Sequence, residues 1–180
     1  MDYERIAEFR NKHIPYREIL EKMMLKSNDS IIDMGAGEGF YTKLFAEIIS
    51  DGEVFCVERE PSAFPRLKAS IGDYGNVKII NKDICDLQLK GFNKVFFSTV
   101  FHDIDCVEDV MKFMKSNSRK PLHVYLIEFN MESKMGPPLD VRIEHDELVK
   151  IFNSYGFTLA EHMDFKYNYF DEFVYNEVIK

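Results

Sequence analysis

The 180-residue chain contains three cysteines, and this small odd number excludes a fully paired disulfide framework. Cys56, Cys85 and Cys106 are widely spaced and form no C-x-x-C pair, so the sequence offers no cysteine motif for zinc. We expect buried thiols of a reducing compartment rather than a disulfide. No metal site is predicted.

Long hydrophobic runs are also missing. No segment approaches the roughly 20 apolar residues that a membrane-spanning helix needs, so we expect no membrane association. The first residues include Asp2, Glu4 and Arg5 and lack the apolar stretch of a signal peptide. Together with the cysteine pattern, these absences predict a cytoplasmic protein.

Positive charge is in deficit. The chain has 23 Lys and Arg against 31 Asp and Glu, which gives a formal net charge of -8 at pH 7. A protein whose main task is to grip phosphate backbones normally presents a basic face. The balance therefore makes a nucleic-acid partner unlikely, although it allows a small anionic substrate held by local Arg or Lys.

Apolar runs of strand length alternate with helical patterns along the chain. Five such runs predict strands at Ile31–Ile32, Val54–Val57, Val77–Ile80, Val95–Phe97 and Leu122–Ile127. Because these runs are apolar throughout, they favour a parallel sheet covered by helices on both faces. The length suffices for one compact domain and is too short for two ordinary ones.

The last part of the chain has a different pattern. Phe157–Lys166 and Tyr169–Ile179 predict two strands whose short Tyr-Asn connection leaves no room for a crossover helix, so they must be antiparallel. We therefore predict an α/β fold with a doubly wound, mostly parallel seven-stranded sheet and a C-terminal antiparallel hairpin. Residues 1–180 are expected to form one domain, with a helical lid at 1–28, broken near Pro15, and a Rossmann-like core at 29–180.

The most informative segment runs from Ser30 to Ala46 and has the sequence S-I-I-D-M-G-A-G-E-G-F-Y-T-K-L-F-A. A short apolar strand ends in Asp33, and Gly35, Gly37 and Gly39 follow before an amphipathic helical pattern begins. A glycine turn between a strand and a helix presents backbone N–H groups to a small polar ligand.

The spacing of this turn narrows the choice of ligand. Phe40 stands where a dinucleotide fingerprint needs its third glycine, and no Gly-Lys-Ser/Thr of a P-loop follows. The acid inside the turn would repel a pyrophosphate but suits an ammonium group. The spacing D-x-G-x-G-x-G resembles the first motif of class I S-adenosylmethionine-dependent methyltransferases.

Three further segments resemble motifs of that family. V-F-C-V-E-R-E ends at Glu58, about 20 residues after the turn, where the family binds the ribose hydroxyls. V-K-I-I-N-K-D-I leads to Asp83 and Ile84, where the family contacts the adenine edge. K-V-F-F-S-T-V-F-H-D-I resembles the segment beside the transferable methyl group.

Two other stretches, R-N-K-H-I-P-Y-R-E-I-L and M-G-P-P-L-D-V-R-I, resemble small archaeal members related to the ubiquinone-biosynthesis and arsenite methyltransferase types. The resemblance implies a methyltransferase with S-adenosylmethionine as its cofactor. The implied cofactor-binding residues are Asp33, Gly35, Ala36, Gly37, Gly39, Glu58, Arg59, Asp83, Ile84, Ser98 and Tyr16.

Several side chains keep two interpretations each. His102 is the candidate catalytic base, and it could equally orient a loop. Asp33 could take part in binding the ligand, or it could do no more than cap its turn. Arg142 could bind an anionic substrate or form a structural salt bridge, and Asp105 is expected to cap a helix. The remaining site candidate, His13, could touch ligand from the lid, whereas His123, His145 and His162 show no partners and are expected to be structural.

The methyl acceptor is predicted from further absences. No N-P-P-Y or D-P-P-Y follows the fourth strand, where Ser98-Thr99-Val100-Phe101 stands, and this counts against the exocyclic amino groups of nucleic-acid bases. A small-molecule acceptor is therefore favoured, with the protein a monomer or homodimer. Two alternatives stay open, a non-catalytic cofactor-binding module and a dinucleotide-dependent oxidoreductase with an aberrant fingerprint.

Overall fold

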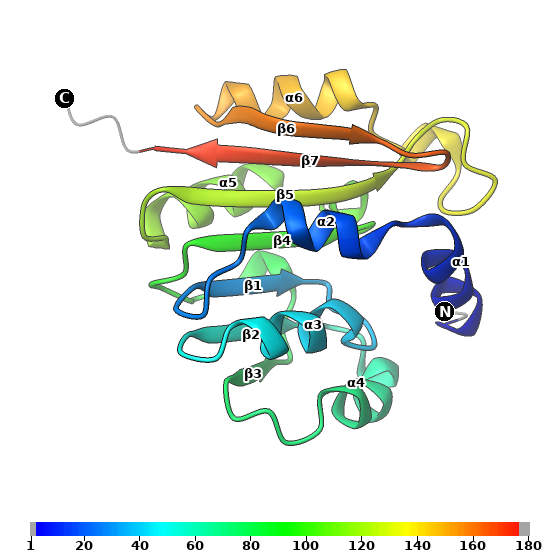
Figure 1. Ribbon diagram of the computed structural model, residues 1–180. Helices are drawn as coiled ribbons and strands as arrows, with labels where there is room; N and C mark the ends of the chain where they lie inside the picture. The colour runs from blue at the N-terminus through cyan, green and yellow to red at the C-terminus, as the bar shows by residue number, and fades with distance from the viewer. Residues whose placement is uncertain (1–2, 177–180) are drawn as a thin grey trace.

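A computed structural model describes residues 3–176 of the chain, apart from the side chains of residues 3 and 6. The described residues form one sheet of seven strands in the order β3-β2-β1-β4-β5-β7-β6 (Figure 1). The strands are β1 (Ser30–Met34), β2 (Glu53–Val57), β3 (Val77–Ile80), β4 (Lys94–Ser98), β5 (Leu122–Phe129), β6 (Thr158–Asp164) and β7 (Asn168–Tyr175).

The first five strands are parallel, and β7 runs antiparallel to both β5 and β6. This is the doubly wound sheet with a final hairpin that the sequence predicts. The expected end of the last strand at Ile179 lies outside the described residues.

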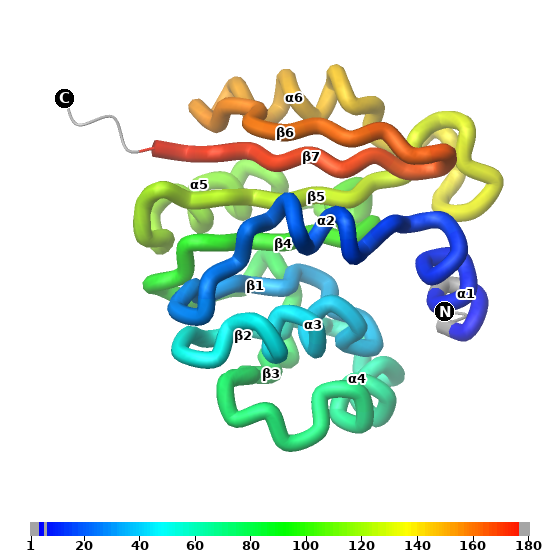
Figure 2. The backbone as a smooth tube through the Cα atoms, in the orientation of Figure 1, coloured from blue at the N-terminus to red at the C-terminus, as the bar shows by residue number. Residues whose placement is uncertain are grey.

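Helices cover both faces of the sheet. They are α1 (Tyr3–His13), α2 (Tyr16–Met23), α3 (Phe40–Ile48), α4 (Phe64–Ile71), α5 (Val107–Asn117) and α6 (His145–Ser154). The helices α2, α3 and α4 lie on one face, and α5 and α6 lie on the other (Figure 1 and Figure 2). No helix of the described residues has the length and apolar character needed to cross a lipid bilayer.

Neighbouring strand residues supply the two cores, because successive side chains point to opposite faces of a sheet. Ile31 and Phe96 pack under α2 and α3, whereas Ile32 and Phe97 pack under α5 and α6. All four side chains are fully buried. Burial on both faces explains why the strands are apolar without alternation.

The proline-containing helices follow the predicted pattern. The N-terminal helix breaks at Pro15, between the end of α1 and the start of α2. The connection after β2 is also helical, with Pro65 in the first turn of α4, where a backbone N–H has no partner within the helix and its loss costs no hydrogen bond. The expected helix cap at Asp105 is wrong, because Cys106 occupies the cap position of α5 and no side chain caps that helix.

The carboxyl ends of the parallel strands meet at one edge of the sheet. In Figure 1 this edge faces α1 and the loop that follows β5. The glycine turn after β1 is fastened there, since the N–H groups of Gly35 and Ala36 both donate to the carbonyl of Val57 at 2.9 Å. This edge is where ligands bind in open α/β sheets.

Candidate functional site

A cavity of about 740 Å³ opens at the carboxyl edge of the sheet, within the roughly 300–1,000 Å³ range of small-molecule sites. Ten of the sequence-predicted site residues line it: Asp33, Gly35, Ala36, Gly37, Glu58, Arg59, Asp83, Ile84, Ser98 and His102. Gly39 and Tyr16 do not line it. Gly39 starts α3, and Tyr16 packs edge-on against the cavity residue Phe40 at 5.0 Å.

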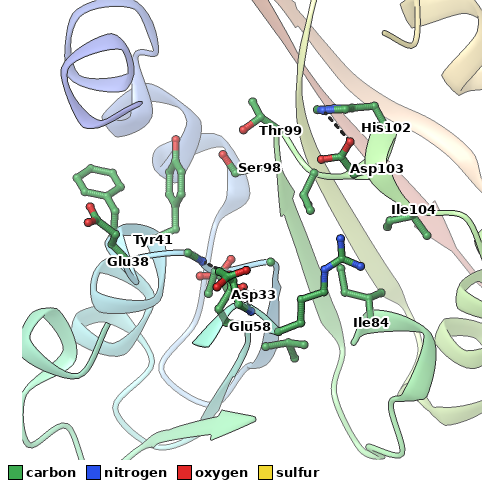
Figure 3. Close-up of a pocket in the computed structure, with 18 of the residues that line it drawn as sticks. Asp33, Glu38, Tyr41, Glu58, Ile84, Ser98, Thr99, His102, Asp103 and Ile104 are labelled. Carbon is green, nitrogen blue, oxygen red and sulfur yellow. Dashed lines mark hydrogen bonds and ion pairs between the residues drawn. The ribbon is translucent and has the colours of Figure 1, made fainter. Parts of the chain in front are cut away.

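The carboxylate of Glu58 lies under the glycine turn (Figure 3). Its Oε2 accepts a hydrogen bond from the Gly37 N–H and its Oε1 from the Glu60 N–H, each at 2.7 Å. Each oxygen keeps a second lone pair for a ligand hydroxyl. A Cβ added at Gly37 would meet no atom within 4 Å, so the turn leaves open space beside this carboxylate.

Asp33 is buried at the floor of the cavity. Its Oδ2 accepts a hydrogen bond from the Thr42 hydroxyl of α3 at 2.5 Å, so its partner belongs to the helix and not to the turn that one of its two interpretations had it cap. Burial raises the pKa of Asp33 to about 7, against the hydrogen bonds from Thr42, and the charge of Glu58 adds to the rise. Asp33 therefore exchanges a proton near neutral pH.

Asp83 and Arg59 form an ion pair at the opposite wall, with Arg59 Nη1 2.8 Å from Asp83 Oδ2. The other Asp83 oxygen accepts from the Cys85 N–H at 3.0 Å and starts the 3₁₀ helix Ile84–Asp86. These two contacts, the Cys85 N–H first, lower the pKa of Asp83 and keep it ionised. Ile84 lines the same wall.

The cysteine prediction is wrong for two of the three residues. Cys85 and Cys106 form a disulfide, with Cα atoms 5.9 Å apart across a sequence separation of 21. The loops after β3 and β4 both begin at the carboxyl edge of the sheet, where they bring Cys85 and Cys106 together. Cys56 is the free, buried thiol among the described residues.

His102 and Glu128 form a buried pair beside the end of β4. His102 Nδ1 lies 2.7 Å from Glu128 Oε2, and Glu128 Oε1 accepts from the backbone N–H of Phe101 at 2.8 Å. Burial alone would lower the pKa of His102, but the hydrogen bond and charge of Glu128, with the charge of Asp103, raise it overall. The Nε2 side of the ring, 3.7 Å from Asp103 Oδ1, belongs to the cavity wall.

Aromatic rings surround the mouth of the cavity. Phe9 of α1 lies within 4.9–6.0 Å, between ring centroids, of His13, Phe129 and Tyr167. Phe9 and Phe129 line the cavity, whereas His13 and Tyr167 pack against Phe9 and do not line it. We call Phe9, His13, Phe129 and Tyr167 the aromatic mouth. All four rings are half-buried.

Two buried polar groups at this end lack partners. The Nε–H of Arg10 has no hydrogen-bond partner among the described residues, and the hydroxyl of Tyr41, which lies beside Ser98, makes no hydrogen bond of good geometry there. The Arg10 guanidinium stacks on Phe40 at 3.7 Å from the ring centroid, and burial lowers its pKa. Unpaired buried groups on a cavity wall mark a place where a ligand supplies the missing bonds.

Arg142 forms no salt bridge among the described residues and does not line the cavity. It donates hydrogen bonds to the backbone carbonyls of Pro137, Asn130, Ser133 and Met135. These bonds fasten the loop after β5 in place, and Met135, Gly136 and Pro137 of that loop line the cavity. Arg142 therefore shapes the cavity indirectly, by holding a loop that lines it.

Sequence reasoning missed Glu128, Phe9, Arg10 and Phe129. Glu128 carried a usable signal, since it is an acid at the carboxyl end of an apolar strand, like Asp33 and Glu58. The other three carried none, because an aromatic or arginine on an amphipathic helix or a strand end is common without any ligand.

Known structures share this fold. A structure of an S-adenosylmethionine-dependent methyltransferase from Aquifex aeolicus matches with a TM-score of 0.84 at 17% identity, over 97% of this chain and 98% of that chain. Among curated proteins, ribosomal RNA small subunit methyltransferase A of Alkaliphilus metalliredigens is 31% identical over 72 residues, 40% of this chain and 24% of its own length.

The probable ribosomal RNA small subunit methyltransferase A of Methanococcus maripaludis is 25% identical over 115 residues, 63% of this chain and 42% of its own length. The chain therefore spans less than half the length of these two curated relatives.

These comparisons support the predicted fold and correct the expected partner. They confirm a methyltransferase fold of the S-adenosylmethionine-dependent class, with the cofactor expected from the sequence. They do not confirm the closer likeness to the ubiquinone-biosynthesis and arsenite types. The prediction that nucleic acid is an unlikely partner, with a small molecule as acceptor, is contradicted by relatives that modify ribosomal RNA. The prediction relied on the net charge of the whole chain, and a total charge does not show how charge is distributed around the site.

The sequence model described as "Ribosomal RNA adenine dimethylase" matches residues 8–125, which is more than half of the chain and includes every sequence-predicted site residue. The chain belongs to the ribosomal RNA adenine dimethylase family.

Proposed function

We propose that this protein transfers a methyl group from S-adenosylmethionine to a nucleobase of RNA. The observation that carries the acceptor half of this proposal is the aromatic mouth, formed by Phe9, His13, Phe129 and Tyr167. Proteins that recognise RNA sequence-specifically hold unstacked bases against aromatic side chains. The curated relatives named above, which are ribosomal RNA methyltransferases, favour the same acceptor class.

The inner half of the cavity suits the cofactor. Glu58 would accept hydrogen bonds from the ribose hydroxyls, and Asp83 with Ile84 would contact the adenine. Asp33 and the glycine turn would hold the amino-acid part, whose ammonium an acid in this position complements. Bound there, the cofactor supplies a methyl group on a positively charged sulfur, already activated for displacement.

The outer half would orient the acceptor. Ser98 and Thr99 end β4 and point into the cavity between the glycine turn and His102 (Figure 3). Thr99 has a left-handed backbone with φ of 54°, fixed by its N–H bond to the Ile127 carbonyl at 2.7 Å. A non-glycine residue in this region is strained, and such strain clusters at functional sites.

His102 is proposed as the group that accepts a proton from the attacking nitrogen or oxygen. Glu128 acts as a positioning residue, because its contact at Nδ1 fixes the ring and turns Nε2 toward the cavity side. Alignment of the two reactants supplies most of the rate enhancement in such displacements, so the base adds to a reaction that geometry already favours.

The acceptor is tested with radiolabelled S-adenosylmethionine and ribosomal RNA, followed by nucleoside digestion and mass spectrometry. We expect one methylated nucleoside. Phe9→Ala, which removes a ring that lines the cavity, should lower kcat/KM for RNA about tenfold, in line with the roughly 1–3 kcal/mol per stacked base, and leave cofactor affinity unchanged. Phe113→Ala, which removes a half-buried phenylalanine of α5 that does not line the cavity, is the matched control. Cofactor binding without label in any RNA would favour the non-catalytic module instead.

Glu58→Gln should weaken cofactor binding, because it removes the charge from hydrogen bonds to the ribose. We expect a loss of about 1–3 kcal/mol, or about 5- to 150-fold in Kd by calorimetry. Glu53→Gln, at the exposed opposite end of β2, should leave Kd unchanged. Equal Kd values for the two variants would remove Glu58 from the cofactor site.

Cofactor affinity should rise with pH through about 7, the pKa to which burial lifts Asp33. Below that pH the carboxyl is protonated and neutral, so it cannot balance the ligand's ammonium group; above it the carboxylate can. Asp33→Asn should flatten this pH dependence and leave the weaker, low-pH affinity. A wild-type Kd that stays constant between pH 6 and 8, roughly one unit either side of this pKa, would contradict the assignment.

The pH profile of methyl transfer should depend on Glu128. The carboxylate raises the pKa of His102 by stabilising its protonated form, and the neutral form is the one that accepts a proton. Glu128→Gln should therefore move the acidic limb of kcat to lower pH. His102→Asn should lower kcat by about 100-fold or more and abolish that limb. A limb that does not move in Glu128→Gln would show that His102 is not the titrating group.

A further inference from the structure

Three side chains that the methyl-transfer site does not use come together at the far edge of the sheet. His145 is the first residue of α6, His162 lies in β6, and Asp171 lies in β7. Figure 1 shows these three elements side by side at the top of the sheet. None of the three residues lines the cavity.

The geometry of this cluster is compact. His145 Nδ1 lies 3.0 Å from Asp171 Oδ2, and His162 Nδ1 lies 2.6 Å from Asp171 Oδ1. One ligand atom from each residue falls within 4.8 Å of the other two, and the imidazole rings are 3.8 Å apart between centroids. Within residues 3–176, His145, His162 and Asp171 form a group of three potential ligand side chains that lie close enough together to hold one metal ion.

From this arrangement we propose that His145, His162 and Asp171 bind a divalent transition-metal ion, with zinc as the physiological species. Two imidazole nitrogens and one carboxylate oxygen are a common ligand set for zinc, at about 2.0–2.2 Å from the ion. An ion held at those distances needs donors about 3 Å apart, and here the two nitrogens contact different oxygens of Asp171 with all three ligand atoms within 4.8 Å of one another, so small side-chain shifts would complete the site.

The burial of the three residues fits an ion rather than two neutral imidazoles. The Asp171 side chain is fully buried, and a buried carboxylate needs a compensating positive charge. The His145 and His162 side chains are 28% and 27% exposed, so solvent reaches the site and can complete the coordination. Asp164, whose Oδ2 lies 3.2 Å from His162 Nε2, orients that ring in the way of an outer-shell partner.

The role of the ion is structural. It joins the start of α6 to the hairpin at the edge of the sheet, where β6 pairs with β7 alone among the described strands. The residue Tyr169, two positions before Asp171 on the same face of β7, donates to the Ile143 carbonyl just ahead of α6. The ion would therefore reinforce an attachment that one hydrogen bond already makes.

Binding is tested on the tag-free protein, stripped with chelator and then titrated with Co²⁺ and Zn²⁺. We expect visible Co²⁺ absorption bands that saturate at one ion per chain, displacement of Co²⁺ by Zn²⁺, and a higher thermal unfolding midpoint with Zn²⁺. Loss of an outer-shell partner weakens metal binding by about 10–100-fold. His145→Gln and His162→Gln each remove a direct ligand, so each should weaken Zn²⁺ binding by at least that factor.

The matched control is His123→Gln. His123 also contacts a carboxylate, with Nδ1 2.6 Å from Glu172 Oε1, but this pair is not part of a three-residue group. Its removal should leave Zn²⁺ affinity unchanged. Circular dichroism of the metal-free variants shows whether each one folds, and the Co²⁺ bands of the wild type give a readout that needs no variant. Absence of saturable Co²⁺ or Zn²⁺ binding to the wild type would overturn the proposal, as would equal affinity in His162→Gln and His123→Gln.

Discussion

The site depends on the attachment of the glycine turn to the end of β2. The carbonyl of Val57 accepts two backbone hydrogen bonds from the turn, and the side chain of the next residue, Glu58, accepts a third from Gly37. Parallel pairing of β1 with β2 sets Met34 opposite Val57, and this register makes all three bonds possible. Without it the turn would have no fixed position relative to the acid that it faces.

Three acids stand at the carboxyl ends of β1, β2 and β5, and each has different hydrogen-bond partners. Asp33 is bonded to the Thr42 hydroxyl, Glu58 to two backbone N–H groups, and Glu128 to a histidine and a backbone N–H. For Asp33, burial outweighs the hydrogen bonds from Thr42 and raises its pKa to about 7. The resulting inner cavity is acidic, which suits a cofactor that carries a sulfonium and an ammonium group.

The fold and the inner half of the cavity could be predicted from the sequence, because both rest on local signals. Apolar runs mark strands, and glycine spacing with Glu58 about 20 residues on marks a ligand turn. The disulfide could not be predicted, since Cys85 and Cys106 meet only through the topology. His145 and His162 appeared to have no partners because Asp171 is supplied by another strand, and spacing along the chain does not reveal pairing across a hairpin.

The inner and outer halves of the cavity draw on different parts of the sequence. The family match covers residues 8–125, which include the glycine turn, Glu58, Asp83 and His102. Glu128, Phe129, the loop at 135–137 and Tyr167 follow that segment, yet Glu128 contacts His102, Phe129 and the loop line the cavity, and Tyr167 packs against Phe9. Family membership therefore speaks mainly to how the cofactor is held. Of the aromatic mouth, Phe9 and His13 lie inside the matched segment, whereas Phe129 and Tyr167 lie outside it. Ser98-Thr99-Val100-Phe101, inside the segment, lacks the N-P-P-Y pattern. The proposed acceptor therefore rests on residues from both sides of that boundary.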